Sequence, residues 1–588
     1  MVVADFIVKY LKKSENLTHI FAYAGGTDTP LLDSIHRCEG VNLVINRHEQ
    51  AVSLAAAGYA LAGERLGVAV AMSGPGATNM VTGIADCWFD SIPVLYLTGQ
   101  VTTGTYKFDN PARQIGYQET DIVSIVKSIT KLAELEIYED KIPNTLRRMI
   151  SKAKSLRPGP VLFDIPFDIL RKELKSSIDE LDIPVKLESP PPVSRVAVDS
   201  FLRVLSSAKR PLIIAGGGVS TKKARDLLFD FVERLKIPVV TSFNGKGVFP
   251  NDHPLYFGFI GAYGNRYANI TMANADLILA IGSRLDTRQT SMPSAFAREA
   301  VKIQVEIDRN ELNNNLVTDL SIYGDICDFM QKVLEVAPVV PVDRYSDWKE
   351  YNSKLFKEFD PLKDGKGTDE NVNPKVFLNK LSIENNDPTI YVTDVGNNSM
   401  FAAQTMVIKR NQKFLVSGGL GTMGFAIPAA IGAYFATPNN RIIAIMGDGG
   451  FQMASYELQT IVHYNIPLHL VVLNNNVLGL MKVFQDENYN GVYPATVEGY
   501  SAPDLGKVAR AYGLNYYKVT TTEEAIDIIP TFLSEKGPVL LEVVMHKDWT
   551  AYPKTRRGLP IEYQNPPIDD ELLKKFMIVP MFKSESKK

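Results

Sequence analysis

The sequence predicts an α/β protein made of three doubly wound parallel-sheet domains. Short apolar runs alternate with amphipathic segments along most of the 588 residues, and this alternation is typical of parallel strands covered by helices on both faces. Two stretches rich in proline or charge interrupt it. The composition, with 45% hydrophobic and 22% charged residues, is that of an ordinary globular protein. At about 150 residues per domain, the length allows three or four domains.

The first predicted domain covers residues 1–180. Its N-terminus, MVVADFIVKYLKKSEN, spaces its apolar residues as a helix does, and Asp5 interrupts it too early for a signal peptide. Strands are predicted in THIFAYAGG, VNLVIN, GVAVAM, IPVLYLTG and GPVLFDIP, each followed by a helical pattern. The proline-rich stretch that follows, residues 181–196, is interpreted as a linker.

The second domain is predicted over 197–344, with strands in RPLIIAGGG, IPVVTSF, ADLILAIGS and VKIQVEID. The polar, charged stretch 345–372 is interpreted as a second linker. The third domain, 373–550, has strands in TIYVTD, IIAIMGD, LHLVVLN and VLLEVVM. The remaining 551–588 form a proline-rich tail with one short helical signal, DDELLKKFM.

Charge and cysteine content exclude several classes of protein. The 63 basic and 66 acidic residues give a net charge of −3, so nucleic acid is not expected as a main partner. The cysteines, Cys38, Cys87 and Cys327, are odd in number and far apart, which argues against a disulfide framework and for a reducing compartment. No stretch approaches the ~18 apolar residues of a membrane span. We therefore expect a soluble, cytoplasmic enzyme.

The strongest chemical signal lies in the third domain. The strand IIAIM ends at Gly447-Asp448-Gly449-Gly450, and Asn475 follows Asp448 by 27 positions, after another apolar strand. Parallel sheets bind ligands where such strands end, and glycines let the backbone approach a phosphate. The oxygens of Asp448 and Asn475 suit Mg²⁺, with a backbone carbonyl and phosphate oxygens completing the octahedron. Two ordinary tight turns are the alternative, which the pairing of both motifs disfavours.

GDG followed by NN resembles the signature of thiamine-diphosphate (ThDP) enzymes. This resemblance implies a pyrimidine-binding, a central and a diphosphate-binding domain, with Mg²⁺ held by Asp448, Asn475 and the carbonyl of Val477. It also implies a glutamate on the cofactor's pyrimidine, and Glu49 in INRHEQAVSLAAAGYA matches it. A carboxylate hydrogen-bonded to ring nitrogen N1′ favours the imino tautomer, whose N4′ removes the C2 proton. Read alone, Glu49 is more simply a carboxylate that complements a helix dipole.

Further segments resemble acetolactate (acetohydroxyacid) synthase catalytic subunits and their close relatives, among them FAYAGGTDTP, SGPGATNMVTGIADCWFDSIPVLYLTGQV and GGLGTMGFAIPAAIGA. The similarity implies catalytic roles for Gly26, Glu49 and Gln118, and an apolar wedge at Met423 that bends the cofactor. The further cofactor contacts that it implies are Gly25, Val395, Gly396, Asn397, Asn398, Gly421, Met423, Gly447, Asp448, Gly449, Gly450, Asn475, Val477, Leu478, Gly479 and Met481.

AGGGVS, TSFNGKGVFPNDHP and IGSRLDTRQT resemble the flavin-binding segments of these synthases, which implies FAD in a structural role. The matching residues are Arg157, Gly216, Gly217, Gly218, Thr241, Gly282, Arg284, Asp286 and Arg288. The sequence contains no GxGxxG in this region, and several ThDP enzymes keep the domain without a nucleotide, so this alternative stays open. Arg288 also matches an arginine associated with the carboxylate of a second 2-oxo acid. A surface or flavin-phosphate arginine is equally compatible with the sequence.

Three departures from the synthases fall where the acceptor would be recognised. Phe167 replaces a lysine, Phe484 replaces a tryptophan, and the stretch TTGTYKFDNPARQ is additional. The residues expected to select the acceptor are Tyr117, Gln118, Arg288, Met481 and Phe484.

The function that follows is ThDP-dependent decarboxylation of a 2-oxo acid, pyruvate in the first place, with carboligation to a second carbonyl compound. The alternatives are a specialised carboligase acting on a sugar, aldehyde or ketone, and a non-oxidative decarboxylase. A regulatory nucleotide-binding protein is disfavoured, because such a protein needs no Glu49. Glu49 and Asp448 lie in different domains, and in the family they meet across a subunit interface. The resemblance therefore implies a homodimer or homotetramer, and it allows a regulatory subunit.

Overall fold

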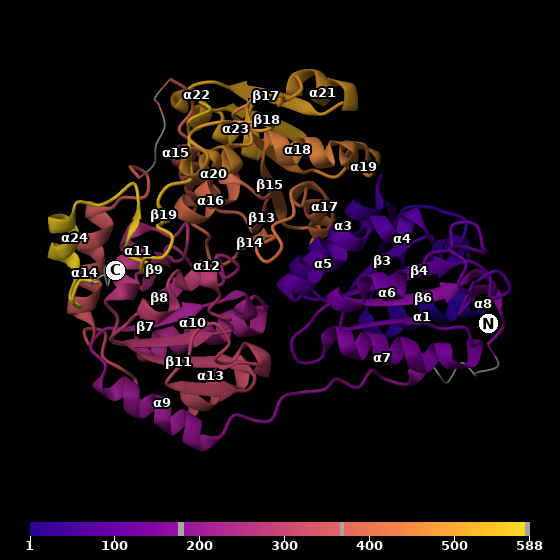
Figure 1. The fold of residues 1–588 in the computed structure, drawn as a ribbon, viewed down its shortest axis with the longest axis horizontal. Helices are drawn as coiled ribbons and strands as arrows, with labels where there is room; N and C mark the ends of the chain where they lie inside the picture. Colours follow the sequence, from indigo (N-terminus) through magenta and orange to yellow (C-terminus); the bar gives the residue numbers. More distant parts are fainter. Residues whose placement is uncertain (175–180, 365–367, 369, 583–588) are drawn as a thin grey trace.

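The computed structural model of the chain describes residues 1–174, 181–364, 368 and 370–582, and it contains three six-stranded sheets (Figure 1). Within each of these sheets, all neighbouring strands are parallel. The predicted fold class is confirmed. Parts of three predicted segments lie outside the described residues: the end of the first domain (175–180), part of the second linker (365–367 and 369) and the end of the tail (583–588).

The first unit has the strand order β2-β1-β3-β4-β6-β5. Its strands are β1 (His19–Ala22), β2 (Asn42–Ile45), β3 (Gly67–Ala71), β4 (Val94–Gln100), β5 (Leu132–Leu135) and β6 (Val161–Pro166). Its helices are α1 (Val3–Glu15), α2 (Thr29–Arg37), α3 (Glu49–Gly63), α4 (Pro75–Asn79), α5 (Val81–Asp90), α6 (Ile122–Val126), α7 (Ile142–Lys154) and α8 (Phe167–Arg171). The predicted N-terminal helix is thus confirmed as α1, and its apolar face is buried in the core of this unit.

The central unit has the order β12-β11-β10-β7-β8-β9. Its strands are β7 (Pro211–Ala215), β8 (Val239–Thr241), β9 (Tyr256–Phe259), β10 (Leu277–Ile281), β11 (Val301–Glu306) and β12 (Leu320–Tyr323). Its helices are α9 (Arg195–Ser207), α10 (Lys222–Leu235), α11 (Arg266–Ala273), α12 (Thr287–Thr290), α13 (Ile326–Val336) and α14 (Ser346–Glu358).

The third unit has the order β14-β13-β15-β16-β18-β17. Its strands are β13 (Thr389–Thr393), β14 (Lys413–Val416), β15 (Arg441–Gly447), β16 (His469–Asn474), β17 (Asn515–Val519) and β18 (Val539–Val544). Its helices are α15 (Pro374–Glu384), α16 (Asn397–Thr405), α17 (Ala426–Ala436), α18 (Asp448–Ala454), α19 (Leu458–His463), α20 (Gly479–Asn488), α21 (Leu505–Tyr512), α22 (Thr522–Asp527) and α23 (Ile529–Ser534). A 3₁₀ turn, η7 (Ser455–Glu457), joins α18 to α19.

In each sheet the strand order reverses at a central position, between β1 and β3, between β7 and β10, and between β13 and β15. The crevice beyond the carboxyl ends of the strands at such a reversal is where doubly wound sheets bind ligands. The glycine-rich segments predicted as binding loops follow these very strands: Gly25 follows β1, Gly216 follows β7 and Asp448 follows β15. The topology therefore positions one candidate crevice in each unit.

The stretch 345–372, predicted as a linker, contains helix α14. Trp348 and Leu355 of this helix are buried in the core of the central unit, and the Trp348 indole donates a hydrogen bond to the carbonyl of Pro211, 3.2 Å away. This part of the stretch therefore packs against the central unit, and its charged residues lie on the exposed face of the helix. The first linker instead runs from the first unit to α9 without a described helix or strand after residue 182 (Figure 1).

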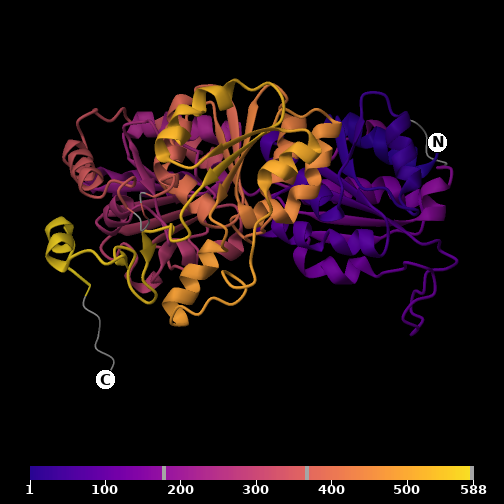
Figure 2. The ribbon, with the colours of Figure 1, turned by 90° about the horizontal axis from the view of Figure 1, so that it is seen from above.

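The tail packs against the central unit. Ile561 and Leu573 belong to its core, and the short helical signal is confirmed as α24 (Asp570–Phe576). A two-stranded antiparallel ribbon, β19 (Lys554–Thr555) with β20 (Gln564–Asn565), precedes this helix. Seen from above, the third unit lies between the other two (Figure 2).

Helices α3 and α17 join the first unit to the third through their backbones. A Cβ atom on Gly58 would lie 2.1 Å from the carbonyl oxygen of Ala429, and one on Gly432 would lie 1.9 Å from that of Ala55. Only glycine fits at these two positions, which explains why the sequence has glycine inside both helices. This contact fixes how the crevices of the first and third units lie relative to each other within one chain.

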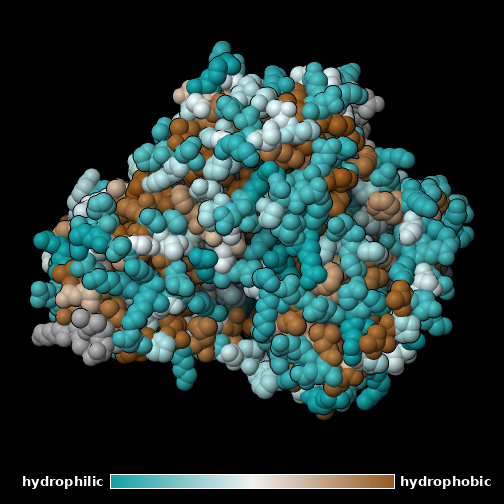
Figure 3. All heavy atoms as spheres, turned by 180° about the vertical axis from the view of Figure 1, so that it is seen from behind, coloured by the Kyte–Doolittle hydropathy of each residue, from teal (hydrophilic) through white to brown (hydrophobic). Residues whose placement is uncertain are grey.

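The three cysteines form no disulfide, as predicted, and Cys87 is buried on α5 with its Sγ 3.2 Å from the hydroxyl of Tyr96. Within the described ranges, no helix combines the length and the apolar character that crossing a bilayer requires. On the face opposite to that of Figure 1, hydrophobic residues lie in several patches among hydrophilic ones (Figure 3).

Candidate functional site

Glu49 is the first residue of α3 and only 8% exposed. Its Oε2 accepts a hydrogen bond from Nδ2 of Asn79, 2.9 Å away. Gly76 lies beside it, so close that a Cβ there would be 3.4 Å from Oε1 of Glu49. The carboxylate thus stands at the amino end of a helix, with one oxygen held by an amide and the other against a glycine.

The segment Ser73–Asn79 brings the predicted catalytic residues of the first unit to one edge of its sheet. The amide of Ser73 donates a hydrogen bond of 2.9 Å to Oγ1 of Thr27. Thr27 directly follows Gly25 and Gly26. On the other side, a Cβ on Gly74 would lie 2.8 Å from the carbonyl oxygen of Gln118. Gln118 itself has a left-handed backbone, with φ of 64°, a conformation that is uncommon for a residue other than glycine.

Gly25 and Gly26 differ in their surroundings. A Cβ on Gly25 would clash with the side chain of Met72, whereas one on Gly26 would meet nothing within 4 Å. Gly26 therefore faces open space, as a residue beside a reacting centre must. Tyr117, next to Gln118, is 84% exposed.

The additional stretch before Gln118 folds around a buried carboxylate that the sequence reasoning missed. Glu119 accepts hydrogen bonds from the amides of Lys107, Ile115 and Gly116 at 2.6, 2.8 and 3.1 Å. The side chain of Gln100 ties the end of this loop to the sheet, donating to the carbonyl of Thr120 at 2.8 Å and to Asp164 at 2.9 Å. The loop that presents Tyr117 and Gln118 is therefore anchored at several points.

In the third unit, Asp448 begins α18 and is 1% exposed. Burial raises the pKa of its carboxyl group, and a hydrogen bond from Tyr500 lowers it. One amide atom of the Asn475 side chain lies 3.2 Å from Oδ1 of Asp448 and 2.9 Å from the carbonyl oxygen of Val477. If that atom is the amide oxygen, three oxygens converge on one point; if it is the nitrogen, it donates to both.

The glycines of GDGG and LG leave a narrow space lined by amides. A Cβ on Gly449 would lie 2.7 Å from the side chain of Leu478 and 3.3 Å from that of Met423. One on Gly479 would lie 2.7 Å from Nδ2 of Asn397, and one on Gly447 would lie 3.8 Å from Nδ2 of Asn398.

The side-chain oxygens of Asn397 and Asn398 are buried and have no hydrogen-bond partner. Both atoms are hydrogen-bond acceptors, so they require a donor and do not themselves indicate a phosphate. The structure brings the predicted cofactor-contacting loops of this unit together at one edge of the sheet, including Val395 and Gly421, whose Cβ would lie 3.9 Å from the Val395 side chain.

Asp394 organises these loops and was missed by the sequence reasoning. Its carboxylate accepts hydrogen bonds from the amides of Val395, Gly424 and Ala426 at 2.9, 3.0 and 2.9 Å. Burial raises its pKa to about 6, against the lowering effect of these bonds. Asp394 follows the apolar strand β13, as Asp448 follows β15, so the same sequence signal could have found it.

Two further missed carboxylates on α5 hold the loop that carries Gly421 and Met423. Asp86 accepts hydrogen bonds from the hydroxyls of Ser417 and Thr422, the latter at 2.8 Å. Asp90 accepts from the amides of Gly418 and Gly419, both at 2.8 Å, and from Nδ2 of Asn244 in the central unit at 2.7 Å. Asp90 thereby joins all three units at one point.

In the central unit, the glycines predicted for FAD lie where two loops cross. A Cβ on Gly216 would lie 2.1 Å from the carbonyl oxygen of Gly282, and one on Gly218 would lie 2.8 Å from the Gly282 Cα. A Cβ on Gly217 would lie 3.0 Å from the Asn244 side chain. The amide nitrogen of Gln289 and the amide oxygen of Gln304 are buried nearby without partners.

The polar side chains predicted for FAD already have partners in the chain. Arg157 forms ion pairs with Asp308 and Glu311 at 3.1 and 2.6 Å. Arg284 pairs with Asp286 at 3.2 Å, and the hydroxyl of Thr241 is buried against that of Tyr256. The glycines are required by the close approach of the two loops to each other, and Arg157 is engaged elsewhere.

The residues predicted to select the acceptor are not brought together within one chain. Met481 and Phe484 are 49% and 44% exposed on α20, which follows the loop of Asn475 and Val477. Arg288 is exposed in the central unit, with its guanidinium 5.9 Å from the centre of the Phe243 ring. Tyr117 and Gln118 belong to the first unit.

Glu49 does not face the Asp448 end of α18 in its own chain. The residues just before it, Asn46 and Arg47, donate hydrogen bonds to Glu457, and the rings of His48 and Tyr456 lie tilted with their centres 5.7 Å apart. Tyr456 lies in η7, past the far end of α18, and the seven residues of α18 span about 10 Å from Asp448. Within one chain, the segment that carries Glu49 therefore contacts the residues just beyond the carboxyl end of α18, whereas Asp448 stands at its amino end.

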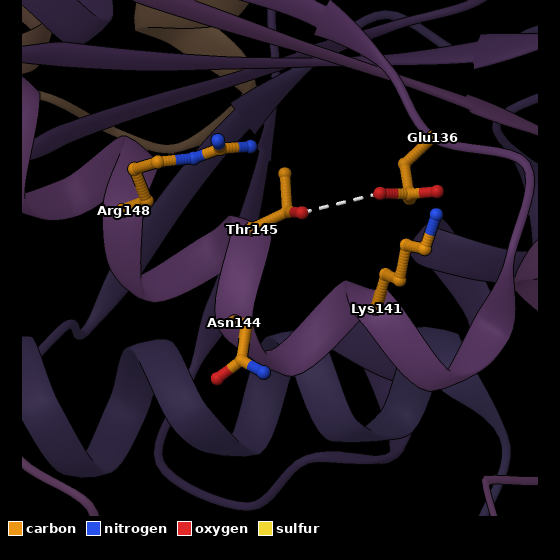
Figure 4. A pocket seen from close by; sticks show the side chains of 5 residues that line it. All are labelled: Glu136, Lys141, Asn144, Thr145 and Arg148. Atoms are coloured by element: carbon orange, nitrogen blue, oxygen red, sulfur yellow. Dashed lines mark hydrogen bonds between the residues drawn. The ribbon is translucent and has the colours of Figure 1, made fainter.

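A separate pocket of about 450 Å³ lies beside α7, lined by Glu136, Lys141, Asn144, Thr145 and Arg148 (Figure 4). Thr145 donates a hydrogen bond to Glu136 across it at 3.2 Å. None of its lining residues belongs to a predicted site. In the described part of the chain, no group of three or more His, Cys, Asp or Glu side chains gathers to hold a metal.

Comparison with known proteins finds similarity in all three units of the fold. Models of the N-terminal TPP (thiamine pyrophosphate, that is ThDP) binding domain, the central domain and the C-terminal TPP binding domain of thiamine pyrophosphate enzymes match residues 1–125, 198–333 and 394–543. Among curated proteins, the probable acetolactate synthase large subunit of Methanocaldococcus jannaschii is 36% identical over 92% of this chain and 91% of its own.

The acetolactate synthase large subunit of Lactococcus lactis is likewise 36% identical, over 92% of both chains. The isozyme 2 large subunit of Escherichia coli is 33% identical over 94% of this chain and 97% of its own. The similarity thus extends over nearly the whole length and all three units. The chain belongs to the thiamine pyrophosphate enzyme family and is a thiamine-diphosphate-dependent enzyme.

Proposed function

We propose that the chain decarboxylates a 2-oxo acid, pyruvate in the first place, and joins the remaining two-carbon unit to a second carbonyl compound, with ThDP and Mg²⁺ as cofactors. The names of the relatives, acetolactate synthase large subunits, support this reaction. The observation that carries the proposal is the convergence of Asp448, Asn475 and the Val477 carbonyl beside a cradle of glycines.

The residues of the third unit fit a magnesium ion. In an octahedron with metal–oxygen distances of about 2.1 Å, neighbouring oxygens are about 3.0 Å apart. The separations of 2.9 and 3.2 Å around the Asn475 amide are close to this value. One carboxylate, one amide and one carbonyl leave the remaining positions to phosphate and water oxygens, which is how Mg²⁺ is commonly held at phosphate sites.

The amide nitrogens of Asn397 and Asn398 each make one long hydrogen bond of 3.4 Å, to the carbonyls of Trp549 and Val395. Each amide has a second hydrogen that can be donated to a phosphate oxygen. The Asp394 carboxylate holds the loop just before these residues by accepting a hydrogen bond from the amide of Val395.

In the first unit, Glu49 would hold the proton at N1′ of the aminopyrimidine. Its carboxylate is buried, fixed by Asn79, and points away from bulk water, which suits a group that exchanges a proton within a closed site. When bound, ThDP supplies the nucleophilic carbon and accepts the electrons released on decarboxylation. Met423, beside Gly449, would press the cofactor into its bent shape.

The three departures from the synthase sequences affect the residues expected to recognise the acceptor. Tyr117, Gln118, Met481 and Phe484 are the candidates for contacting it, and Arg288 is the candidate for a carboxylate on it. Phe484 in place of tryptophan and the loop folded around Glu119 favour, as a second candidate function, carboligation to an aldehyde, ketone or sugar.

We further propose a homodimer, or a tetramer of such dimers, with each site formed by Glu49 of one chain and Asp448 of another. In support, Glu49 and Asp448 are turned to different ends of α18, and both half-sites expose large apolar side chains. Among these are Phe89, Tyr117, Leu420, Met453, Met481 and Phe484. Because the relatives are named large subunits, a smaller regulatory subunit is part of the proposal.

A structural FAD in the central crevice completes the proposal. In support, the unpaired amide nitrogen of Gln289 and the unpaired amide oxygen of Gln304 offer a nucleotide one donor and one acceptor. Arg157 would need to leave Asp308 and Glu311 to contact it, so its role as a flavin ligand stays a prediction. A flavin absorption spectrum of the purified protein would support this part, and a colourless protein that binds no added FAD would contradict it.

Incubation of the purified protein with ThDP, Mg²⁺ and pyruvate, followed by mass spectrometry of the products, tests the reaction. Acetolactate is the expected product, and added 2-oxobutyrate or aldehydes reveal other acceptors by their own adducts. Acetaldehyde alone would identify a decarboxylase, and no consumption of pyruvate or of other 2-oxo acids would contradict the proposal.

A further inference from the structure

The two carboxylate oxygens of Asp448 face different partners. Oδ1 faces the Asn475 amide and, through it, the Val477 carbonyl. Oδ2 accepts a hydrogen bond from the hydroxyl of Tyr500 at 2.7 Å. One oxygen is thus turned to the Asn475 amide, and the other is engaged by a neutral donor.

Tyr500 is itself held on both sides. Its hydroxyl accepts a hydrogen bond from Nε2 of Gln452, one turn along α18, at 3.1 Å. The same hydroxyl would lie 3.3 Å from a Cβ on Gly449. With its proton given to Asp448 and a lone pair taken by Gln452, the hydroxyl has a defined orientation.

The segment that carries Tyr500 is fastened to the loop that carries Asn475 and Val477. The amide of Ala502 donates to Oδ1 of Asn476 at 2.7 Å, and the amide of Leu478 donates to the carbonyl of Thr496 at 3.0 Å. These two bonds flank Tyr500 on either side along the chain. The segment 496–502 and the loop 475–478 therefore hold their positions together.

We propose that Tyr500 is a positioning residue for the metal-binding carboxylate. By occupying Oδ2 it fixes the rotation of the Asp448 side chain and presents Oδ1 alone to the cation. Mg²⁺ demands a nearly ideal octahedron, so a carboxylate that is free to rotate or to offer both oxygens binds it less well. This inference rests on the proposed metal site and adds a residue that none of the loop motifs contains.

Removing the hydroxyl with Tyr500→Phe tests this role directly. Hydrogen-bond partners of metal ligands typically contribute about 10- to 100-fold to affinity, and we expect a loss of Mg²⁺ affinity in this range. Calorimetric titration of Mg²⁺ into the full-length protein with ThDP and without pyruvate gives this value independently of turnover. In a steady-state assay of pyruvate consumption, the Mg²⁺ concentration that gives half-maximal activity should rise by a similar factor. The kcat at saturating Mg²⁺ and the KM for pyruvate should stay within about threefold of the wild-type values.

The matched control is Tyr493→Phe. Tyr493 lies in the same region, and its hydroxyl bonds to Asp486, away from Asp448. This variant should bind Mg²⁺ as the wild type does. Melting temperatures measured without cofactor show whether either variant is misfolded, and Gln452→Leu, which removes only the support of the Tyr500 hydroxyl, should weaken Mg²⁺ binding by a smaller factor.

An unchanged Mg²⁺ affinity in Tyr500→Phe would overturn the proposal, as would a fall in kcat that saturating Mg²⁺ does not restore. Asp448→Asn in the same titration separates the two levels of inference. If Asp448→Asn binds Mg²⁺ normally, the proposed metal site is wrong. If it loses binding while Tyr500→Phe does not, only the role of Tyr500 is wrong.

Discussion

Replacing Glu49 with glutamine should lower the rate of pyruvate consumption by about 10²- to 10⁴-fold, the usual contribution of a positioned acid–base group. Glutamine keeps the size of the side chain and can still face Asn79, but it has no carboxylate to share a proton with N1′. Steady-state kinetics at saturating ThDP and Mg²⁺ measure this loss. Calorimetry should show that ThDP still binds, because the diphosphate loops of the third unit are unchanged.

Glu64→Gln is the matched control, because Glu64 caps the other end of the same helix and forms an ion pair with Lys413 at 2.7 Å. It should retain wild-type kinetics. A Glu49→Gln variant that consumes pyruvate as fast as the wild type would contradict the role assigned to this carboxylate.

Replacing Asp448 with asparagine should abolish Mg²⁺-dependent binding of ThDP at ordinary Mg²⁺ concentrations. Loss of a metal ligand costs more than loss of its hydrogen-bond partner, so we expect an affinity loss beyond about 100-fold. Asparagine also removes the negative charge that offsets the cation. Calorimetric titration of ThDP at a fixed Mg²⁺ concentration measures the effect without any substrate.

Asp387→Asn, in the same unit, serves as the control, since Asp387 is exposed and pairs with Arg441 at 2.6 Å, away from the loops. Its ThDP affinity should equal that of the wild type. Full ThDP affinity in Asp448→Asn would show that the cation is held elsewhere.

The fold was largely predictable because the central strands of each sheet are buried on both faces. Such strands are continuous apolar runs, and all of them were found. Besides the two-residue strands β19 and β20, the described strands that were not predicted are β5, β9, β12, β14 and β17, and every one lies at the edge of its sheet. The first four have only four residues each, and β17, NYYKV, is mostly half-buried or exposed, so their apolar pattern is weak. Helix α14 was taken for a linker because its exposed face carries most of its residues.

The candidate site was predictable where a motif joins a strand end to glycines. The loops of Gly25, Asp448 and Asn475 have this form, and the structure brings each of them to a crevice at a reversal of strand order. The residues that support these loops are not part of such a motif. Asp86 and Tyr500 act through partners that are distant in sequence. Glu119 bonds to amides of its own loop, and no local pattern distinguishes a buried carboxylate that caps a loop from an exposed one. Their roles emerge only from the hydrogen bonds that the fold creates.

In the proposed dimer, each active site combines Glu49 of one chain with Asp448 of another. Two differently tagged chains, one with Glu49→Gln and one with Asp448→Asn, can be co-expressed and purified through both tags as a mixed dimer. If the sites lie between chains, one of the two sites in this dimer is wild type in both residues, and about half of the wild-type activity is expected. A mixed dimer of Glu49→Gln with the double variant has no such site and should be inactive. If the first mixed dimer is no more active than either variant alone, each site is built within one chain and the account is wrong.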